Sequence, residues 1–269
     1  MPRSVSYVST CSRDGWAEYG ERFVASFIKY FPPSVKLYFY IDFKPTIRNH
    51  RVIYRHPDEC TGLSDFHSNI ARMPFARGDE LVHDLHNQCH NPHIIWNARK
   101  FSFKVFTVEH AVLNNESDAV FWLDADSIAF RPIDDQLISN TLPPHCMVSY
   151  LGRADKYSEC GYIGYNMHHP MTSVFARFVA DLYRSGTVFS FKEWHDSYVW
   201  DIVRVMFERH YGVTNFNISW REMNADHVFI NCILGDYLDH MKGPRKSEGK
   251  SNEADLIFTR DPGYWKSAS

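Results

Sequence analysis

The chain has 269 residues, of which 44% are hydrophobic and 16% aromatic, enough for one large α/β domain or two small ones. Its 29 basic and 32 acidic residues give a net charge of -3, which argues against a general nucleic-acid binder. No run of about eighteen apolar residues is present, so we expect no transmembrane segment.

Six cysteines are scattered through the chain without paired spacing. Residues 1–7 lack the long apolar stretch of a secretory signal peptide. Both features favour free thiols in a reducing compartment, so we expect a cytoplasmic protein. Because we find no internal repeat, linker or low-complexity tract, we expect residues 1–269 to form a single domain.

The first part of the chain alternates strand and helix patterns. Strands are predicted for residues 4–9, 35–41 and 51–54. Between the first two, aromatic residues at helical spacing predict a helix over 16–30, which Pro32 and Pro33 end. This β-α-β-β order favours an α/β layered domain.

Residues 57–98 are interrupted by prolines and glycines and predict little regular structure. They contain a group of potential zinc ligands, namely His83, His86, Cys89, His90 and His93. The spacing fits no zinc signature, and surface histidines in a loop explain the group as well.

The strongest signal lies near the middle of the chain, where five apolar residues predict a buried strand over 119–123. Asp124 and Asp126 follow it directly, at the edge where open α/β sheets place their ligands. Two close carboxylates repel each other unless a cation lies between them, so the pair indicates a divalent-metal site. The alternative is that both residues cap a turn together with Ser127.

A predicted helix over 100–114 leads into this strand. Lys100 and Lys104 share one face of it, and the basic residues Arg99 and Lys104 could lie over the acidic pair. The alternative for each is a solvated side chain.

The second half continues the α/β pattern. Strands are predicted at 147–151 and 157–166, and a helix at 171–185. A further helix begins near Asp196 and ends at Gly212, and Asp196 fits its N-cap.

Residues 237–246 carry the second strong signal. They combine His240, the glycine Gly243, whose backbone can approach a ligand closely, and three basic residues that include Lys246. A histidine beside basic residues can complete a metal site begun by distant carboxylates.

Together these motifs resemble those of metal-dependent glycosyltransferases of the GT-A type. Asp124-Ala125-Asp126 matches their Asp-x-Asp motif, and the segment from His240 to Lys246 is similar to the His-x-x-Gly-x-x-Lys motif of a retaining branch. That branch includes glycogenin and bacterial lipopolysaccharide galactosyltransferases. The resemblance implies a single Rossmann-like domain with a mostly parallel central sheet flanked by helices. Its nucleotide-sugar part would span about 1–130 and its acceptor and catalytic part about 131–269.

The resemblance also implies roles for individual residues. Asp124, Asp126 and His240 would bind Mn²⁺, with Mg²⁺ as a second possibility, and Asp196 would lie near the donor sugar. The expected donor contacts are Thr10, Arg99, Lys104, Asp124, Ala125, Gly243 and Lys246. If the reaction inverts the anomeric centre, Asp196 or Glu193 becomes the candidate general base.

The predicted activity is manganese-dependent transfer of a hexose from a nucleotide sugar, with UDP favoured, to a glycan or other hydroxyl acceptor with retention. The alternatives are a metal-dependent nucleotidyltransferase, a phosphotransferase or phosphatase, and a non-catalytic carbohydrate-binding module. Nucleotidyltransferases usually carry a glycine-rich basic loop after the first strand, whereas residues 10–15 hold one glycine and one arginine.

Overall fold

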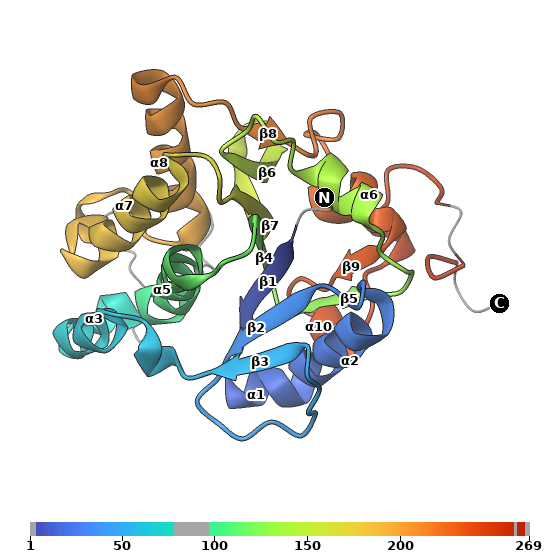
Figure 1. Cartoon of the computed structure of the whole chain (residues 1–269), viewed down its shortest axis with the longest axis horizontal. Coiled ribbons are helices and arrows are strands. Elements are labelled where there is room, and N and C mark those ends of the chain that lie inside the picture. The colour runs from blue at the N-terminus through green and yellow to red at the C-terminus, as the bar shows by residue number, and fades with distance from the viewer. Residues whose placement is uncertain (1–3, 78–96, 261–262, 267–269) are drawn as a thin grey trace.

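The computed structural model describes residues 4–77, 97–260 and 263–266. Its middle layer is a seven-stranded sheet with the order β3-β2-β1-β4-β7-β6-β8 (Figure 1). Its strands are β1 (Val5–Thr10), β2 (Lys36–Tyr40), β3 (Val52–Arg55), β4 (Ala119–Leu123), β6 (Val148–Arg153), β7 (Lys156–Asn166) and β8 (Phe216–Asn217). Within this sheet β7 pairs antiparallel with β4 and β6, and the other neighbours pair in parallel.

One face of the sheet is covered by helices that lie together on one side of Figure 1. They are α3 (Leu63–Ile70), α4 (Pro74–Arg77), α5 (Ala98–Asn114), α7 (Thr172–Arg184) and α8 (Asp196–Tyr211). Their apolar side chains pack on Val120 and Trp122 of β4.

The other face is covered by α2 (Glu21–Tyr30), α6 (Asp135–Thr141) and α9 (Val228–Asn231). Here Phe121 and Leu123 of β4 join the core, so successive residues of β4 are buried on opposite faces. The shorter helical elements are α1 (Arg13–Gly15), a π-helical turn (Trp16–Gly20), α10 (Arg245–Glu248) and 3-10 turns at Pro57–Glu59, Thr187–Ser190, Ile233–Asp236 and Glu253–Asp255.

A second, two-stranded sheet pairs β5 (Ser127–Ala129) with β9 (Leu238–His240) in antiparallel fashion. Its register places Ser127 opposite His240. The segment after the Asp-x-Asp motif is therefore joined by backbone hydrogen bonds to the histidine motif, although the two lie far apart in the sequence.

The predicted α/β class, with a mostly parallel central sheet flanked by helices, is confirmed, and it is the arrangement expected for a GT-A domain. The strand predicted over 119–123 is buried throughout. The short strands β5, β8 and β9 were not predicted, because two or three residues give no readable periodicity.

The N-cap assignment of Asp196 is wrong. His195 is the N-cap of α8, and its Nδ1 accepts a hydrogen bond from the backbone N–H of Tyr198. Asp196 is instead the first helical residue, which leaves its carboxylate for other partners.

Three further expectations can be compared with the structure only within the described residues. The possible zinc ligands at 83–93 lie outside them. The five cysteines that are described, Cys11, Cys60, Cys146, Cys160 and Cys232, are free thiols. Within the described ranges, no helix has both the length and the apolar character needed to cross a lipid bilayer.

Candidate metal and donor site

The Asp-x-Asp motif occupies a tight turn between β4 and β5. The backbone N–H of Asp124 donates to the carbonyl of Gly161 on β7, and that of Ser127 donates to the carbonyl of Asp124. On the far side of the turn, the N–H of Met241 donates to the carbonyl of Asp126. The turn is thus held by β7 and by the chain after β9, which fixes where both carboxylates point.

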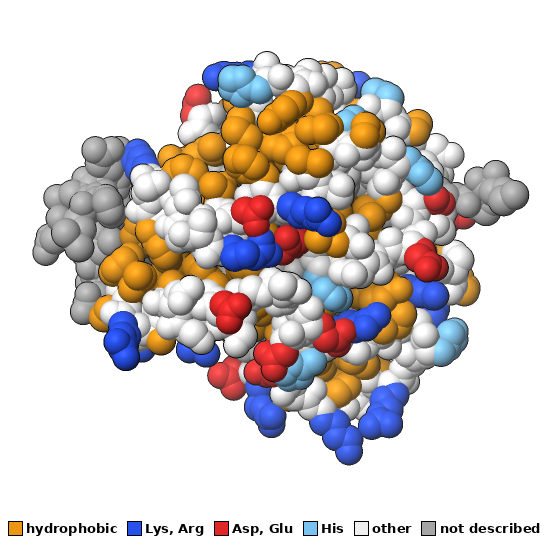
Figure 2. Space-filling view, turned by 60° about the vertical axis from the view of Figure 1, so that its left-hand side comes forward, with side chains coloured by type: hydrophobic (Ala, Val, Ile, Leu, Met, Phe, Trp, Pro, Cys, Tyr) orange, Lys and Arg blue, Asp and Glu red, His pale blue; other side chains and the backbone are white. Residues whose placement is uncertain are grey.

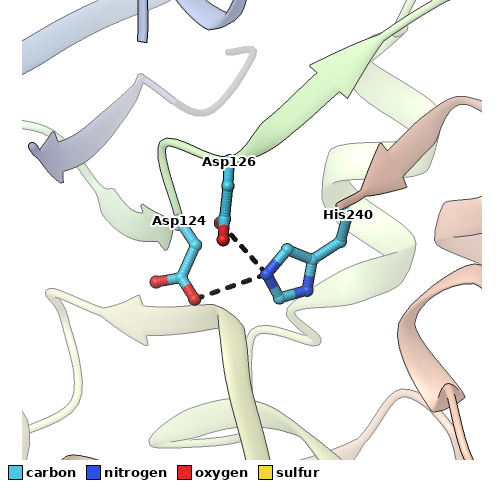
Figure 3. A group of neighbouring side chains, drawn as sticks. All are labelled: Asp124, Asp126 and His240. Carbon is cyan, nitrogen blue, oxygen red and sulfur yellow. Dashed lines mark ion pairs between the residues drawn. The ribbon is translucent and has the colours of Figure 1, made fainter. Parts of the chain in front are cut away.

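Asp124, Asp126 and His240 point toward one another (Figure 3). The Nε2 atom of His240 is 3.2 Å from Oδ1 of Asp126 and 3.6 Å from Oδ2 of Asp124. One ligand atom from each residue lies within 4.8 Å of the others. Two carboxylates and one imidazole are ligand types that divalent metal ions accept. The residues present therefore fit a divalent metal.

The charges of this group favour a bound cation. Burial would raise the pKa of Asp126, but His240 and Lys246 hold it well below its usual value, so this carboxylate stays ionised. Burial would lower the pKa of His240, but Asp126 and Glu159 raise it to about 9. Metal binding would therefore have to release a proton from the imidazole.

Lys246 reaches the same group from the short helix α10. Its Nζ lies 2.8 Å from Oδ2 of Asp126 and 5.1 Å from the centre of the Tyr19 ring. Gly243, which begins the turn into α10, has a φ of +57°, a conformation that side chains disfavour. The structure thus brings His240 and Lys246 of the histidine motif to the two aspartates.

A second ion-pair group lies on the other side of Asp124. The Nζ of Lys104, on α5, is 3.3 Å from Oδ1 of Asp124 and 2.9 Å from Oδ2 of Asp196. Trp122 also donates its indole N–H to Oδ1 of Asp124, at 2.5 Å. Burial would raise the pKa of Asp196, but the ammonium of Lys104 lowers it, so Asp196 is a carboxylate beside the candidate metal site.

Glu193 lies in the loop before α8, and both of its carboxylate oxygens form hydrogen bonds with neighbouring side chains. Its Oε1 accepts from the Tyr157 hydroxyl at 2.6 Å, and its Oε2 lies 2.9 Å from Nε2 of His195. Because Nδ1 of His195 caps α8, Nε2 carries the proton and donates to Glu193. This network fixes the start of the helix that carries Asp196.

A pocket of about 790 Å³ lies over both groups and extends from the turn after β1 to the start of α5. Of the expected donor contacts, those that line it are Thr10, Arg99, Lys104, Asp124, Ala125 and Lys246. Gly243 is not among its lining residues, and its role is in the turn. Figure 2 shows acidic and basic side chains side by side in the middle of one face, with hydrophobic side chains around them.

Two contributors to this region were not predicted. Tyr19 lines the pocket from the π-helical turn, a rare element that the helical spacing of aromatics did not reveal. Glu159 is buried in β7 and contacts His240. An acidic residue within an otherwise buried strand pattern was the available signal for it.

No protein-family model and no curated protein matches this sequence. Among solved structures, the fold is similar to that of mouse xyloside xylosyltransferase 1 in its apo form, with a TM-score of 0.46 and 11% sequence identity. The match covers 80% of this chain and 85% of that one. Likeness at this level carries no conclusion about activity, so the functional argument rests on the side chains of the site.

Proposed function

We propose that the chain is a metal-dependent glycosyltransferase that moves a hexose from a UDP-sugar to a hydroxyl acceptor. The observation that supports this is the meeting of Asp124, Asp126 and Lys246 at one pocket, with His240 behind the two aspartates. A volume of about 790 Å³ is within the range of sites for small molecules and cofactors. We further propose that residues 1–269 act as one catalytic unit, with the nucleotide held mainly by residues 1–130.

Asp124, Asp126 and His240 would hold the metal, and the imidazole favours Mn²⁺ over Mg²⁺. When bound, this ion would neutralise charge on the leaving diphosphate as a Lewis acid. Lys246 now pairs with Asp126, and it would turn toward the diphosphate once the metal neutralises that carboxylate.

In the transfer step, the acceptor oxygen bonds to the anomeric carbon while the bond from that carbon to the diphosphate oxygen breaks. If the configuration is retained, a diphosphate oxygen can take the acceptor proton on the same face, and Asp196 stabilises positive charge on the sugar. If it is inverted, Asp196 or Glu193 removes the proton. Because both oxygens of Glu193 are engaged, Asp196 is the stronger candidate in either case.

The test is a screen of nucleotide sugars with the purified protein, in Mn²⁺ and then in excess EDTA. We expect release of one nucleoside diphosphate that EDTA abolishes and that Asp126→Ala and His240→Ala both lack. Pyrophosphate production would indicate a nucleotidyltransferase, and phosphate release a phosphatase. Tight nucleotide binding without turnover of any donor would favour a non-catalytic binding module.

A further inference from the structure

Behind the imidazole of His240 lies a buried carboxylate that the Asp-x-Asp and histidine motifs do not contain. Glu159 comes from β7, and its Oε1 is 2.8 Å from Nδ1 of His240, the ring nitrogen that faces away from the aspartates. Both side chains are 4% exposed, so water does not compete for this contact. Its other oxygen, Oε2, lies 2.5 Å from Nζ of Lys242.

We propose that Glu159 is a positioning residue that fixes the orientation and the tautomer of His240 for metal binding. Both ring nitrogens of His240 face carboxylates that only accept hydrogen bonds. The contact of Nδ1 with Glu159, at 2.8 Å, is shorter than that of Nε2 with Asp126, at 3.2 Å, so the proton of the neutral imidazole stays on Nδ1. Nε2 then presents its lone pair toward Asp124 and Asp126. A carboxylate behind a metal-binding histidine also raises the basicity of the nitrogen that binds the metal.

The surroundings of the ring agree with this role. A Cβ atom at Gly161 would come within 2.6 Å of Cε1 of His240, so only glycine leaves room for the ring beside β7. The Phe229 ring lies 4.9 Å from the imidazole, centre to centre. The backbone carbonyl of His240 also accepts from Nε2 of His227 at 2.8 Å. Packing thus fixes the position of the His240 ring, and a hydrogen bond fixes its backbone. The contact with Glu159 then decides which ring nitrogen carries the proton.

The inference rests on the proposed metal site but not on sugar transfer, so its test is Mn²⁺ binding to the otherwise ligand-free protein. Titration followed by electron paramagnetic resonance would compare wild type with Glu159→Gln and Glu159→Ala. We expect the dissociation constant for Mn²⁺ to rise about 10-fold for Gln, whose amide oxygen still accepts, and up to about 100-fold for Ala.

Lys156→Met is the matched control, because it removes an exposed lysine of β7 whose partner is Asp226 and leaves both partners of Glu159 in place. It should bind Mn²⁺ nearly as wild type does. A second readout is the nitrogen NMR spectrum of the imidazoles in metal-free protein at a pH above the pKa of His240. There, wild type should show the Nδ1–H tautomer of His240, and the Ala variant a mixture.

The outcomes separate the two proposals. If wild type binds Mn²⁺ and a folded Glu159→Ala variant binds it within twofold, with the same tautomer, the positioning role is wrong. If wild type binds no Mn²⁺, the metal site fails and the positioning role fails with it. If Mn²⁺ binds and Glu159 matters but no donor turns over, only the proposed activity fails.

Discussion

Asp124 lies between two ion-pair groups, each of which joins a lysine to aspartates, and the two lysines differ in how far they are exposed. The group with Asp126, His240 and Lys246 is assembled by the small sheet of β5 and β9 and by α10. The group with Lys104 and Asp196 is assembled by α5 and α8. Lys246 is 24% exposed and Lys104 only 12%, so the first lysine can leave its carboxylate more readily than the second.

This difference predicts different roles for two lysines that look alike in the sequence. Lys104 neutralises buried carboxylates, and its loss would leave charge without a partner inside the protein. Lys246 lines the pocket beside Asp124 and Asp126, and in the proposed function a donor phosphate would take the place of Asp126 as its partner. Burial and the number of partners, not residue type, separate a structural cation from a binding one.

The largest effect is expected from the first group. Asp126→Asn removes one negative ligand and one partner of His240, so Mn²⁺ affinity should fall by at least about 100-fold, beyond what an outer partner contributes. Calorimetric titration of the ligand-free protein measures this. Asp135→Asn, at an exposed position of α6, is the control and should bind as wild type. Equal affinities in the two variants would show that the metal binds elsewhere.

The second group should respond in stability. Lys104→Met leaves Asp196 buried without its cation, so unfolding in urea at pH 7 should cost about 3–5 kcal/mol less. Adding Asp196→Asn removes the unpaired negative charge and should recover part of the lost free energy of unfolding. A double-mutant cycle measures this recovery. Independent, additive effects would mean that the Lys104–Asp196 pair contributes nothing.

The Lys104–Asp196 pair makes the free energy of unfolding depend on pH, and the Lys104→Met substitution reverses the direction of this dependence. In wild type, Lys104 outweighs burial and lowers the pKa of Asp196, so the contribution is present above the unfolded pKa and is lost as pH falls through the folded one. Without Lys104, burial raises that pKa. The stability of Lys104→Met relative to the double variant should therefore decline as pH rises through it. Urea unfolding at a series of pH values between about 2 and 8 checks both directions.

A smaller effect on stability is expected in the group that contains Lys246. Lys246→Met leaves the buried Asp126 paired with His240, so the free energy of unfolding should fall by less than for Lys104→Met. If Lys246 binds the diphosphate, the KM for the donor should rise nonetheless. A variant as unstable as Lys104→Met, with unchanged KM, would reverse the roles that we assign to the two lysines.

The sequence predicted the elements with long, regular patterns and the residues in short motifs. The unbroken apolar run over 119–123 is typical of a strand buried on both faces. Asp124, Asp126 and His240 were also paired correctly in space, because each carries metal-binding chemistry in a recognisable setting. Neither success required knowledge of side-chain contacts.

What the sequence could not show depends on tertiary packing. The strands that join the two motifs, β5 and β9, are three residues each, and their pairing leaves no periodic trace. Glu159 was missed for a related reason, since a buried acid is explained only by the partners that surround it. The N-cap alternative for Asp196 is wrong because N-cap preference is a local tendency, whereas the buried Lys104 is a nonlocal partner.

The smallest effect is expected at Glu193, where two functions can be told apart. If Glu193 serves only to hold Tyr157 and His195 in place, Glu193→Gln should lower the free energy of unfolding by about 1 kcal/mol. The reason is that one of its two hydrogen bonds loses its acceptor. Turnover of the donor should then change by less than about tenfold, since a general base contributes about 100-fold or more. Asp196→Asn is the comparison and should lose much more turnover. A loss of about 100-fold in kcat for Glu193→Gln, with an unchanged Tm, would identify Glu193 as the base and the reaction as inverting.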